Sequence, residues 1–179
     1  MRRTYKMNIA GLDRELPLCS VDETLDIAAF NMFSDVEITV AAAAELLKRT
    51  PEFDVIITAE SKGIPLAYEM ARQSGKPYTI ARKSVKVYMT DPISIQVKSI
   101  TTQKVQTLYL SVEDEQLLAK KRVLIVDDVI STGESLLALE KLVGISDGNI
   151  VCKAAVLAEG GAADRDDIVF LEKLPVFPK

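Results

Sequence analysis

Histidine is absent from this chain of 179 residues, and cysteine occurs only at Cys19 and Cys152. The absence of histidine excludes a Ser-His-Asp triad and any histidine-ligated metal site. Two cysteines are too few for a disulfide framework or a cysteine-rich zinc site. No apolar stretch approaches the roughly 20 residues that span a bilayer, and the N-terminal residues MRRTYK lead into alternation where a signal peptide would be continuously apolar. We therefore expect a cytoplasmic protein with no membrane partner.

Positive charge is not in excess either. Lys and Arg total 22 against 26 Asp and Glu, which gives a net charge of −4. Proteins dedicated to nucleic-acid binding usually have a basic face, so we expect no nucleic-acid partner. The hydrophobic content of 48% and the charged content of 27% are ordinary for a globular protein. Because we find no repeat, low-complexity tract or linker, we expect residues 1–179 to form one domain.

Apolar runs alternate with helix-like segments along most of the chain, which is typical of an α/β fold. The expected strands are residues 54–58, 78–81, 107–110, 123–126 and 150–157. The expected helices are residues 35–47 after a Ser34 or Asp35 cap, 65–73 before a Gly75 stop, and 135–143. We predict a mostly parallel, twisted, Rossmann-like sheet flanked by helices. Residues 5–21 alternate around Gly11 and predict a hairpin.

Residues 123–135, with the sequence VLIVDDVISTGES, are the most informative segment. Asp127 and Asp128 follow a buried apolar run, so they are expected at the carboxyl end of a strand, where α/β sheets bind ligands. Residues 131–135 then form a turn into a helix, whose free N–H groups and dipole favour a phosphate. Acceptors for sugar hydroxyls thus lie beside donors for a phosphate. The alternative interpretation is an ordinary capped helix with solvated acids.

This segment resembles the phosphoribosyl-pyrophosphate (PRPP) signature of the type I phosphoribosyltransferases. The shared pattern is an apolar strand, two acids, two variable residues and a small-Thr-Gly-x-Ser/Thr loop. The resemblance implies an α/β core with a small N-terminal hood, and it implies that Asp127 and Asp128 are the catalytic acids. It assigns the 5-phosphate of PRPP to Ser131, Thr132, Gly133, Glu134 and Ser135. Many members have Gly where this chain has Glu134, so the glutamate charge must point away from the phosphate.

Two basic clusters extend the resemblance to the purine branch of the family. Residues 59–63, AESKG, resemble the EARGF loop of adenine phosphoribosyltransferases, with Lys62 at the Arg position. Residues 82–86 resemble their Arg-Lys-x-x-Lys cluster. The implied diphosphate-binding residues are Ser61, Lys62, Arg82, Lys83 and Lys86, with a cis peptide expected at Ser61-Lys62. Solvated basic turns are the alternative interpretation of both clusters.

Residues 84–106 lack clear periodicity and correspond to the flexible loop that closes over the ribose in this family. Ser99 and Thr101 are expected near its tip. Many adenine enzymes have a Glu near the Thr101 position, whereas the tip SITTQ also resembles xanthine phosphoribosyltransferases. The resemblance therefore leaves the turnover and the preferred base open.

The base-binding side of the site is the least defined by the sequence. Relatives acting on 6-oxopurines often place a Lys near the end of the strand after the PRPP helix, but here that strand ends with Glu159. Lys153 lies nearer its start, so the missing cation favours a 6-amino base, which Glu159 would contact. Xanthine, guanine and orotate enzymes and a non-catalytic PRPP-sensing regulator remain alternatives.

Further expectations follow from the resemblance. Residues 1–34 would form the hood and residues 35–179 the PRPP-binding core. The partners would be PRPP, a free purine base and a second copy of the chain in a homodimer, and transfer to adenine would give AMP and diphosphate. Magnesium would be the cofactor, held mainly by oxygens of PRPP and water with no direct protein ligand, as suits a hard octahedral ion.

Overall fold

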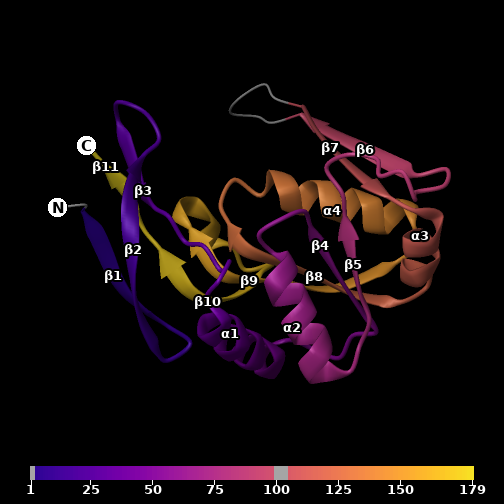
Figure 1. Ribbon diagram of the computed structural model, residues 1–179, viewed down its shortest axis with the longest axis horizontal. Helices are drawn as coiled ribbons and strands as arrows, with labels where there is room; N and C mark the ends of the chain where they lie inside the picture. Colours follow the sequence, from indigo (N-terminus) through magenta and orange to yellow (C-terminus); the bar gives the residue numbers. More distant parts are fainter. Residues whose placement is uncertain (1–2, 99–104) are drawn as a thin grey trace.

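The computed structural model describes residues 3–98 and 105–179, and a five-stranded sheet lies at its centre. The strands lie in the order β10 (Val169–Leu174), β9 (Asn149–Glu159), β8 (Arg122–Ile130), β4 (Val55–Ala59) and β5 (Tyr78–Ala81). Each neighbouring pair in this order is parallel. The predicted parallel α/β sheet is therefore confirmed (Figure 1).

Helices cover both faces of the sheet (Figure 1). On one face lie α1 (Val36–Arg49) and α2 (Ile64–Ser74), whereas α4 (Glu134–Ile145) covers the other. An antiparallel ribbon of β6 (Ile93–Lys98) and β7 (Val105–Leu110) packs over α4, and α3 (Val112–Leu118) follows it. The chain thus forms three layers with a ribbon added outside the third. In the described residues, the structure has no helix that is both long and apolar enough to cross a membrane.

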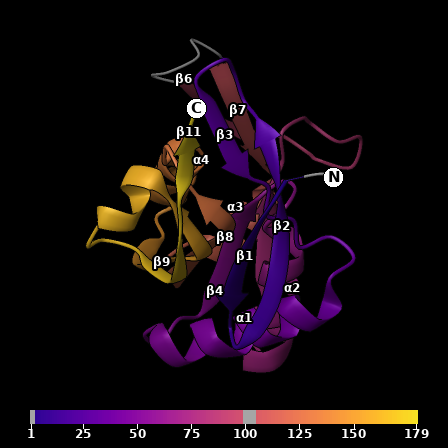
Figure 2. The ribbon, with the colours of Figure 1, turned by 90° about the vertical axis from the view of Figure 1, so that its left-hand side faces the viewer.

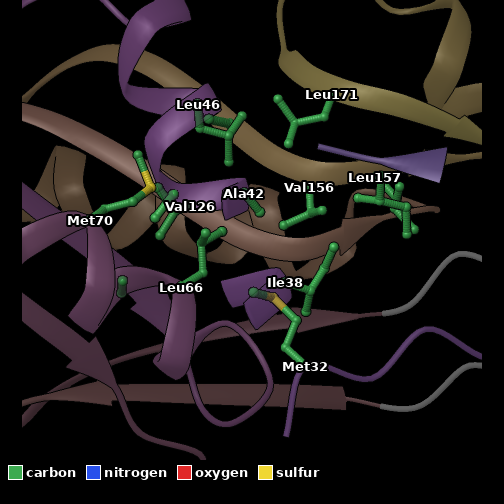
Figure 3. Packing of buried hydrophobic residues seen from close by; sticks show 14 of the residues in the cluster. Met32, Ile38, Ala42, Leu46, Leu66, Met70, Val126, Val156, Leu157 and Leu171 are labelled. Carbon is green, nitrogen blue, oxygen red and sulfur yellow. The ribbon is translucent and has the colours of Figure 1, made fainter. Parts of the chain in front are cut away.

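Capping and stop residues define the ends of α1 and α2. Asp35 caps α1 by accepting a hydrogen bond from the backbone N–H of Ile38 at 3.1 Å. Pro65 lies in the first turn of α2, and Gly75 ends that helix in the left-handed conformation at φ 70°. Figure 3 shows how α1 and α2 pack on the strands: Ile38, Ala42, Leu46, Leu66 and Met70 meet Val126, Val156 and Leu157.

The hood is a four-stranded sheet of β1 (Thr4–Ile9), β2 (Leu12–Ser20), β3 (Leu25–Ala28) and β11 (Val176–Pro178). The predicted hairpin is β1 and β2, and Gly11 turns between them at φ 83°. Figure 2 shows β11 beside β3, so both ends of the chain belong to the hood. The expected hood boundary at residue 34 missed β11, because three residues at the C-terminus have no pattern that distinguishes a strand.

The expectation of an aperiodic loop over residues 84–106 was wrong for residues 93–98, 105 and 106, which lie in strands. Residues 93–97 alternate, and Val97 packs against α4 with only 4% of its surface exposed. Lys98 ends this strand, and the ribbon resumes at Val105. Ser99 and Thr101 lie outside the described residues. The strands β3, β10 and β11 and the helix α3 were not predicted.

One ion-pair group joins the hood to the core. Arg14 of β2 donates two hydrogen bonds to Asp35, at 2.7 and 3.0 Å, and a third to Glu37 at 2.8 Å. The hydrogen bonds from Arg14 hold the pKa of the Asp35 carboxyl below its usual value.

Replacing Arg14 by Met removes this ion pair while keeping an apolar stem. We expect the Arg14→Met variant to lose about 1 kcal/mol of unfolding free energy at pH 7, because both partners remain partly exposed. Since the folded pKa of Asp35 is lowered, the contribution exists above the unfolded pKa and disappears as the pH falls through the folded value. Urea unfolding at pH 7 and pH 3 measures this. Lys6→Met, which removes an exposed pair with Glu15, is the control, and an equal loss at both pH values would contradict the prediction.

Candidate functional site

The predicted site residues gather where β4 and β8 separate. These strands pair from Val55↔Val123 to Ile57↔Ile125, whereas β8 remains paired with β9 as far as Ile130↔Ala158. The order of strands also reverses here, since β5 follows β4 on one side and β9 follows β8 on the other. Such a switch point opens a crevice outside the carboxyl ends of the strands, where α/β proteins bind ligands.

Asp127 and Asp128, the acid pair, lie within β8 and not after it. The strand was expected to end at Val126, but its pairing with β9 continues it to Ile130. Asp128 is only 6% exposed and Asp127 is half-buried. The backbone N–H of Asp128 donates to Oδ1 of Asp127 at 2.9 Å. Burial raises the pKa of both carboxyls, and the charge of Asp128 raises that of Asp127 further.

Gly63 is needed at the crevice because the backbone approaches the acid pair closely. A Cβ atom on this residue would lie 2.2 Å from Oγ1 of Thr58 and 3.0 Å from Oδ1 of Asp127. Its φ of −71° is one that any residue can adopt. Glycine is therefore needed here for the close approach and not for a strained backbone dihedral. Any larger side chain would displace Asp127 or the end of β4.

Residues 131–135, the predicted phosphate cradle, form the turn from β8 and the first two residues of α4. Gly133 precedes α4 in the left-handed conformation at φ 78° and caps it without a side chain. A hollow of about 50 Å³ lined by the cradle and Asp127 lies at this N-terminus, where the helix dipole favours an anion. Ser135 Oγ lies 3.4 Å from the side-chain amide of Gln106 on β7.

Glu60 joins the two predicted diphosphate-binding clusters. It accepts a hydrogen bond from the backbone N–H of Lys83 at 2.9 Å, and its carboxylate lies 3.8 Å from Arg82 and 3.6 Å from Lys86. The hydrogen bond from Lys83, together with these two charges, lowers the pKa of Glu60. Glu60 thus holds residues 82–86 against the loop that contains Ser61 and Lys62, and the two basic clusters lie side by side.

The cations and acids share one electrostatic field. Lys62 is exposed, and its charge partly offsets the burial that raises the pKa of Asp128 and of Glu159. Lys83 acts in the same sense on Asp127. Residues from the ends of four strands, β4, β5, β8 and β9, therefore meet at one edge of the sheet, where they offer cations for an anion and acceptors for hydroxyls.

Glu159 ends β9 and is half-buried, which raises the pKa of its carboxyl. A Cβ on the next residue, Gly160, would lie 3.4 Å from Val176 of β11, so the hood reaches this strand end. Lys153 lies farther back, where its Nζ donates to Glu140 at 2.8 Å and also to Asp167. Lys153 is thus paired with two carboxylates, and its distance from a bound base stays a prediction.

One local prediction was wrong, and three residues were missed. The non-proline cis peptide joins Glu60 to Ser61, one bond before the expected position. Glu60, Gln106 and Arg165 were given no role by the sequence, although each contacts the cradle or the basic clusters. Glu60 lies inside the AESKG loop, residues 59–63, so its place in that motif could have indicated a role. Gln106 and Arg165 have no motif, and only folding brings them near.

Over residues 3–98 and 105–179, the structure contains no group of three or more His, Cys, Asp or Glu side chains that could hold a metal ion. The two carboxylates of the acid pair are hard oxygen ligands of the type that magnesium prefers. They suit an ion that also takes oxygens from a bound substrate and water.

The phosphoribosyl transferase domain family matches residues 32–175 of the chain. Among similar proteins, a xanthine phosphoribosyltransferase of Exiguobacterium is 29% identical over 152 residues, 83% of this chain and 78% of its own length. A hypoxanthine/guanine phosphoribosyltransferase of Methanosarcina acetivorans is 34% identical over 128 residues, 72% of this chain and 61% of its own. The purine biosynthesis transcriptional repressor of Bacillus subtilis is 33% identical over 114 residues, 64% of this chain and 39% of the repressor.

Solved structures share the fold. The adenine phosphoribosyltransferase of Thermoanaerobacter pseudethanolicus aligns with a TM-score of 0.67 at 23% identity, covering 79% of this chain and 84% of that one. The enzyme of Giardia lamblia, complexed with 9-deazaadenine, has a TM-score of 0.64 at 17% identity and covers 95% and 93%. At these identities the likeness establishes the architecture.

The raised pKa values of the acid pair predict a pH-dependent cost to stability. Above about pH 4 the unfolded chain releases protons that the folded carboxyls retain, so stability falls as the pH rises toward the folded pKa. We expect Asp127→Asn to gain at least ~1 kcal/mol, equivalent to about 2–4 °C, at pH 7.5 and to gain nothing near pH 4. Thermal unfolding across this range measures the effect, with the exposed Glu23→Gln as control. A gain that is largest at low pH would refute the account.

Proposed function

The chain belongs to the phosphoribosyltransferase domain family, and we propose that it transfers the 5-phosphoribosyl group of PRPP to a free purine base. Adenine is the proposed base, and AMP and diphosphate are the products. The observation that carries the proposal is the convergence of the acid pair, the phosphate cradle and the basic clusters at the switch point between β4 and β8. A nucleotide-binding domain without this chemistry would not need all three.

PRPP offers three groups, and the site has a counterpart for each. The 5-phosphate would accept hydrogen bonds from the backbone N–H groups of the cradle. Asp127 and Asp128 would accept hydrogen bonds from the ribose hydroxyls, and their charge would favour positive charge near C1. Ser61, Lys62, Arg82, Lys83 and Lys86 would bind the diphosphate. Magnesium, where bound, would neutralise diphosphate charge through oxygens of PRPP, with water and the acid pair completing its surroundings.

In the transfer itself, N9 of the purine attacks C1 of the ribose with inversion. The C1–N9 bond forms as the bond from C1 to the diphosphate oxygen breaks, and the base loses the N9 proton. The protein contributes by aligning the reactants and by stabilising the charge that grows on the leaving diphosphate. Neither contribution requires histidine, so its absence from the chain is no obstacle.

Two features support adenine over a 6-oxopurine. Lys153 is bound to Glu140 and Asp167, and no other Lys or Arg lies among the last seven residues of β9, 153–159. An O6 atom would therefore find no partner from this strand end, whereas the Glu159 carboxyl could accept from a 6-amino group. A site that leaves a polar group unmatched can reject the wrong base strongly.

Two other functions are supported by particular similarities. The named activities of the relatives from Exiguobacterium and Methanosarcina favour a 6-oxopurine as the base. The similarity to the Bacillus subtilis repressor favours a PRPP-sensing regulator that binds without turnover. The homodimer, the cytoplasmic location and the single-domain organisation stay predictions.

Product formation with each base separately tests the proposal. The purified protein would receive PRPP and magnesium with adenine, hypoxanthine, guanine, xanthine or orotate. We expect AMP from adenine and no product from the other bases. Asp127→Asn should lose nearly all activity and serves as the control for contaminating enzymes.

The alternatives give distinct results in the same assay. Turnover of a 6-oxopurine would mean that the absence of a cation beside Glu159 does not decide the base. PRPP binding without product from any base would favour the sensor. If PRPP neither bound nor reacted, the proposed function would be wrong.

Glu159 gives a sharper test of base recognition. Glu159→Gln keeps the size of the side chain but replaces one acceptor oxygen by a donor. We expect the KM for adenine to rise about tenfold, equal to ~1.4 kcal/mol, while the KM for PRPP stays within twofold. Glu172→Gln, an exposed change on β10, is the matched control. An unchanged KM for adenine would remove Glu159 from the base site.

A further inference from the structure

We propose that Arg165 is a further binding residue for the 5-phosphate group, supplying a positive charge that the cradle itself lacks. The inference rests on the proposed function, because the phosphate concerned is that of PRPP. Residues 131–135 contain two serines, a threonine, a glycine and a glutamate, and so no cation. Their donors are backbone N–H groups and hydroxyls.

Arg165 follows the short 3-10 helix η1 (Gly160–Asp164) and lies against the cradle. Its Nη1 is 2.9 Å from the point that a Cβ on Gly133 would occupy. Gly133 is the residue in the left-handed conformation at the start of α4. The guanidinium therefore contacts the cradle at the residue that sets its shape, and glycine leaves the space for this contact.

The orientation of Arg165 is fixed by a chain of ion pairs. Its Nε and Nη2 donate to Asp167 at 2.8 and 2.7 Å, which turns Nη1 toward Gly133. Asp167 also accepts from Lys153 of β9, and Lys153 donates to Glu140 of α4 at 2.8 Å. This series of ion pairs ends at Glu140 on α4, and α4 is the helix whose first turn belongs to the cradle. Arg165 is thus held in place by the element that it would assist.

Charge explains why a guanidinium at this position matters. A phosphate monoester has a charge of about −1.5 to −2 at neutral pH, whereas a helix N-terminus offers about half a positive charge. The remaining site cations, Lys62 and residues 82–86, come from the β4 and β5 ends of the sheet. Arg165 comes from beyond β9, so it adds positive charge from the opposite side. Its side chain is 34% exposed, which leaves the attraction only partly screened.

A purely structural ion-pair chain is the competing explanation, and it makes a different prediction. Loss of a structural pair would lower stability and weaken every ligand alike. Loss of a phosphate-binding residue would weaken ligands that have a 5-phosphate and spare free diphosphate. The two explanations separate when ribose 5-phosphate and diphosphate are compared.

The test is calorimetric binding of ribose 5-phosphate and of diphosphate to the full chain, with the KM for PRPP measured in parallel. For Arg165→Met we expect about tenfold weaker binding of ribose 5-phosphate and a similar rise in the KM for PRPP. Binding of diphosphate should change by less than twofold. Arg165→Lys should recover part of the loss, because it restores the charge without the fork.

Lys173→Met is the matched control, since it removes an exposed cation on β10 that pairs with Asp164 at 3.8 Å. Unchanged binding of ribose 5-phosphate to Arg165→Met would overturn the inference, as would equal weakening of both ligands. If Arg165→Met unfolds, the same comparison is made with Arg165→Lys. Wild-type protein that turns over PRPP while both variants keep its KM refutes only the role of Arg165. Wild-type protein that binds no PRPP refutes the proposed function and this inference with it.

Discussion

The close approach of Gly63 to Asp127 is the constraint on which the site depends. A single Cβ at residue 63 would collide with Thr58 and crowd the Asp127 carboxylate. This contact seats the loop after β4 directly against β8, at the point where the two strands stop pairing. Because both strands end at the same edge, the contact sets the distance between the loop containing Ser61 and Lys62 and the acid pair.

The negative charges of the acid pair on β8 lie near positive charges from the loops after β4 and β5. Burial raises the pKa of both carboxyls of the acid pair, and the positive charges of Lys62 and Lys83 partly offset that effect. Glu60 in turn holds residues 82–86 beside the loop. A dianionic ligand would therefore enter a site whose cations are already positioned, which lowers the cost of ordering them on binding. Local stability is reduced at such a site, since the acids would be easier to accommodate as neutral groups.

The site has two halves: one is formed by local sequence motifs, and the other is formed by segments that are far apart in the chain. The half around the acid pair and the cradle lies within residues 32–175, which match the phosphoribosyl transferase domain family, and the fold is shared with adenine phosphoribosyltransferases. The other half is built from the end of β9 and from the hood, whose last strand comes from the far C-terminus. Under the proposed function this second half would contact the base, so a small change there would alter the base preference without altering the fold.

The sequence by itself determined the parallel sheet, the helices on its faces, the acid pair and the cradle, because continuous apolar runs and a strand-to-helix loop are local patterns. It misjudged the length of β8 and half of the ribbon, since pairing with β9 and packing on α4 decided those. Tertiary structure alone decided that β11 completes the hood, that Glu60 joins the basic clusters, and that Arg165 lies against Gly133. These contacts join residues that are far apart in the chain or depend on the direction of a side chain, and no short motif encodes either.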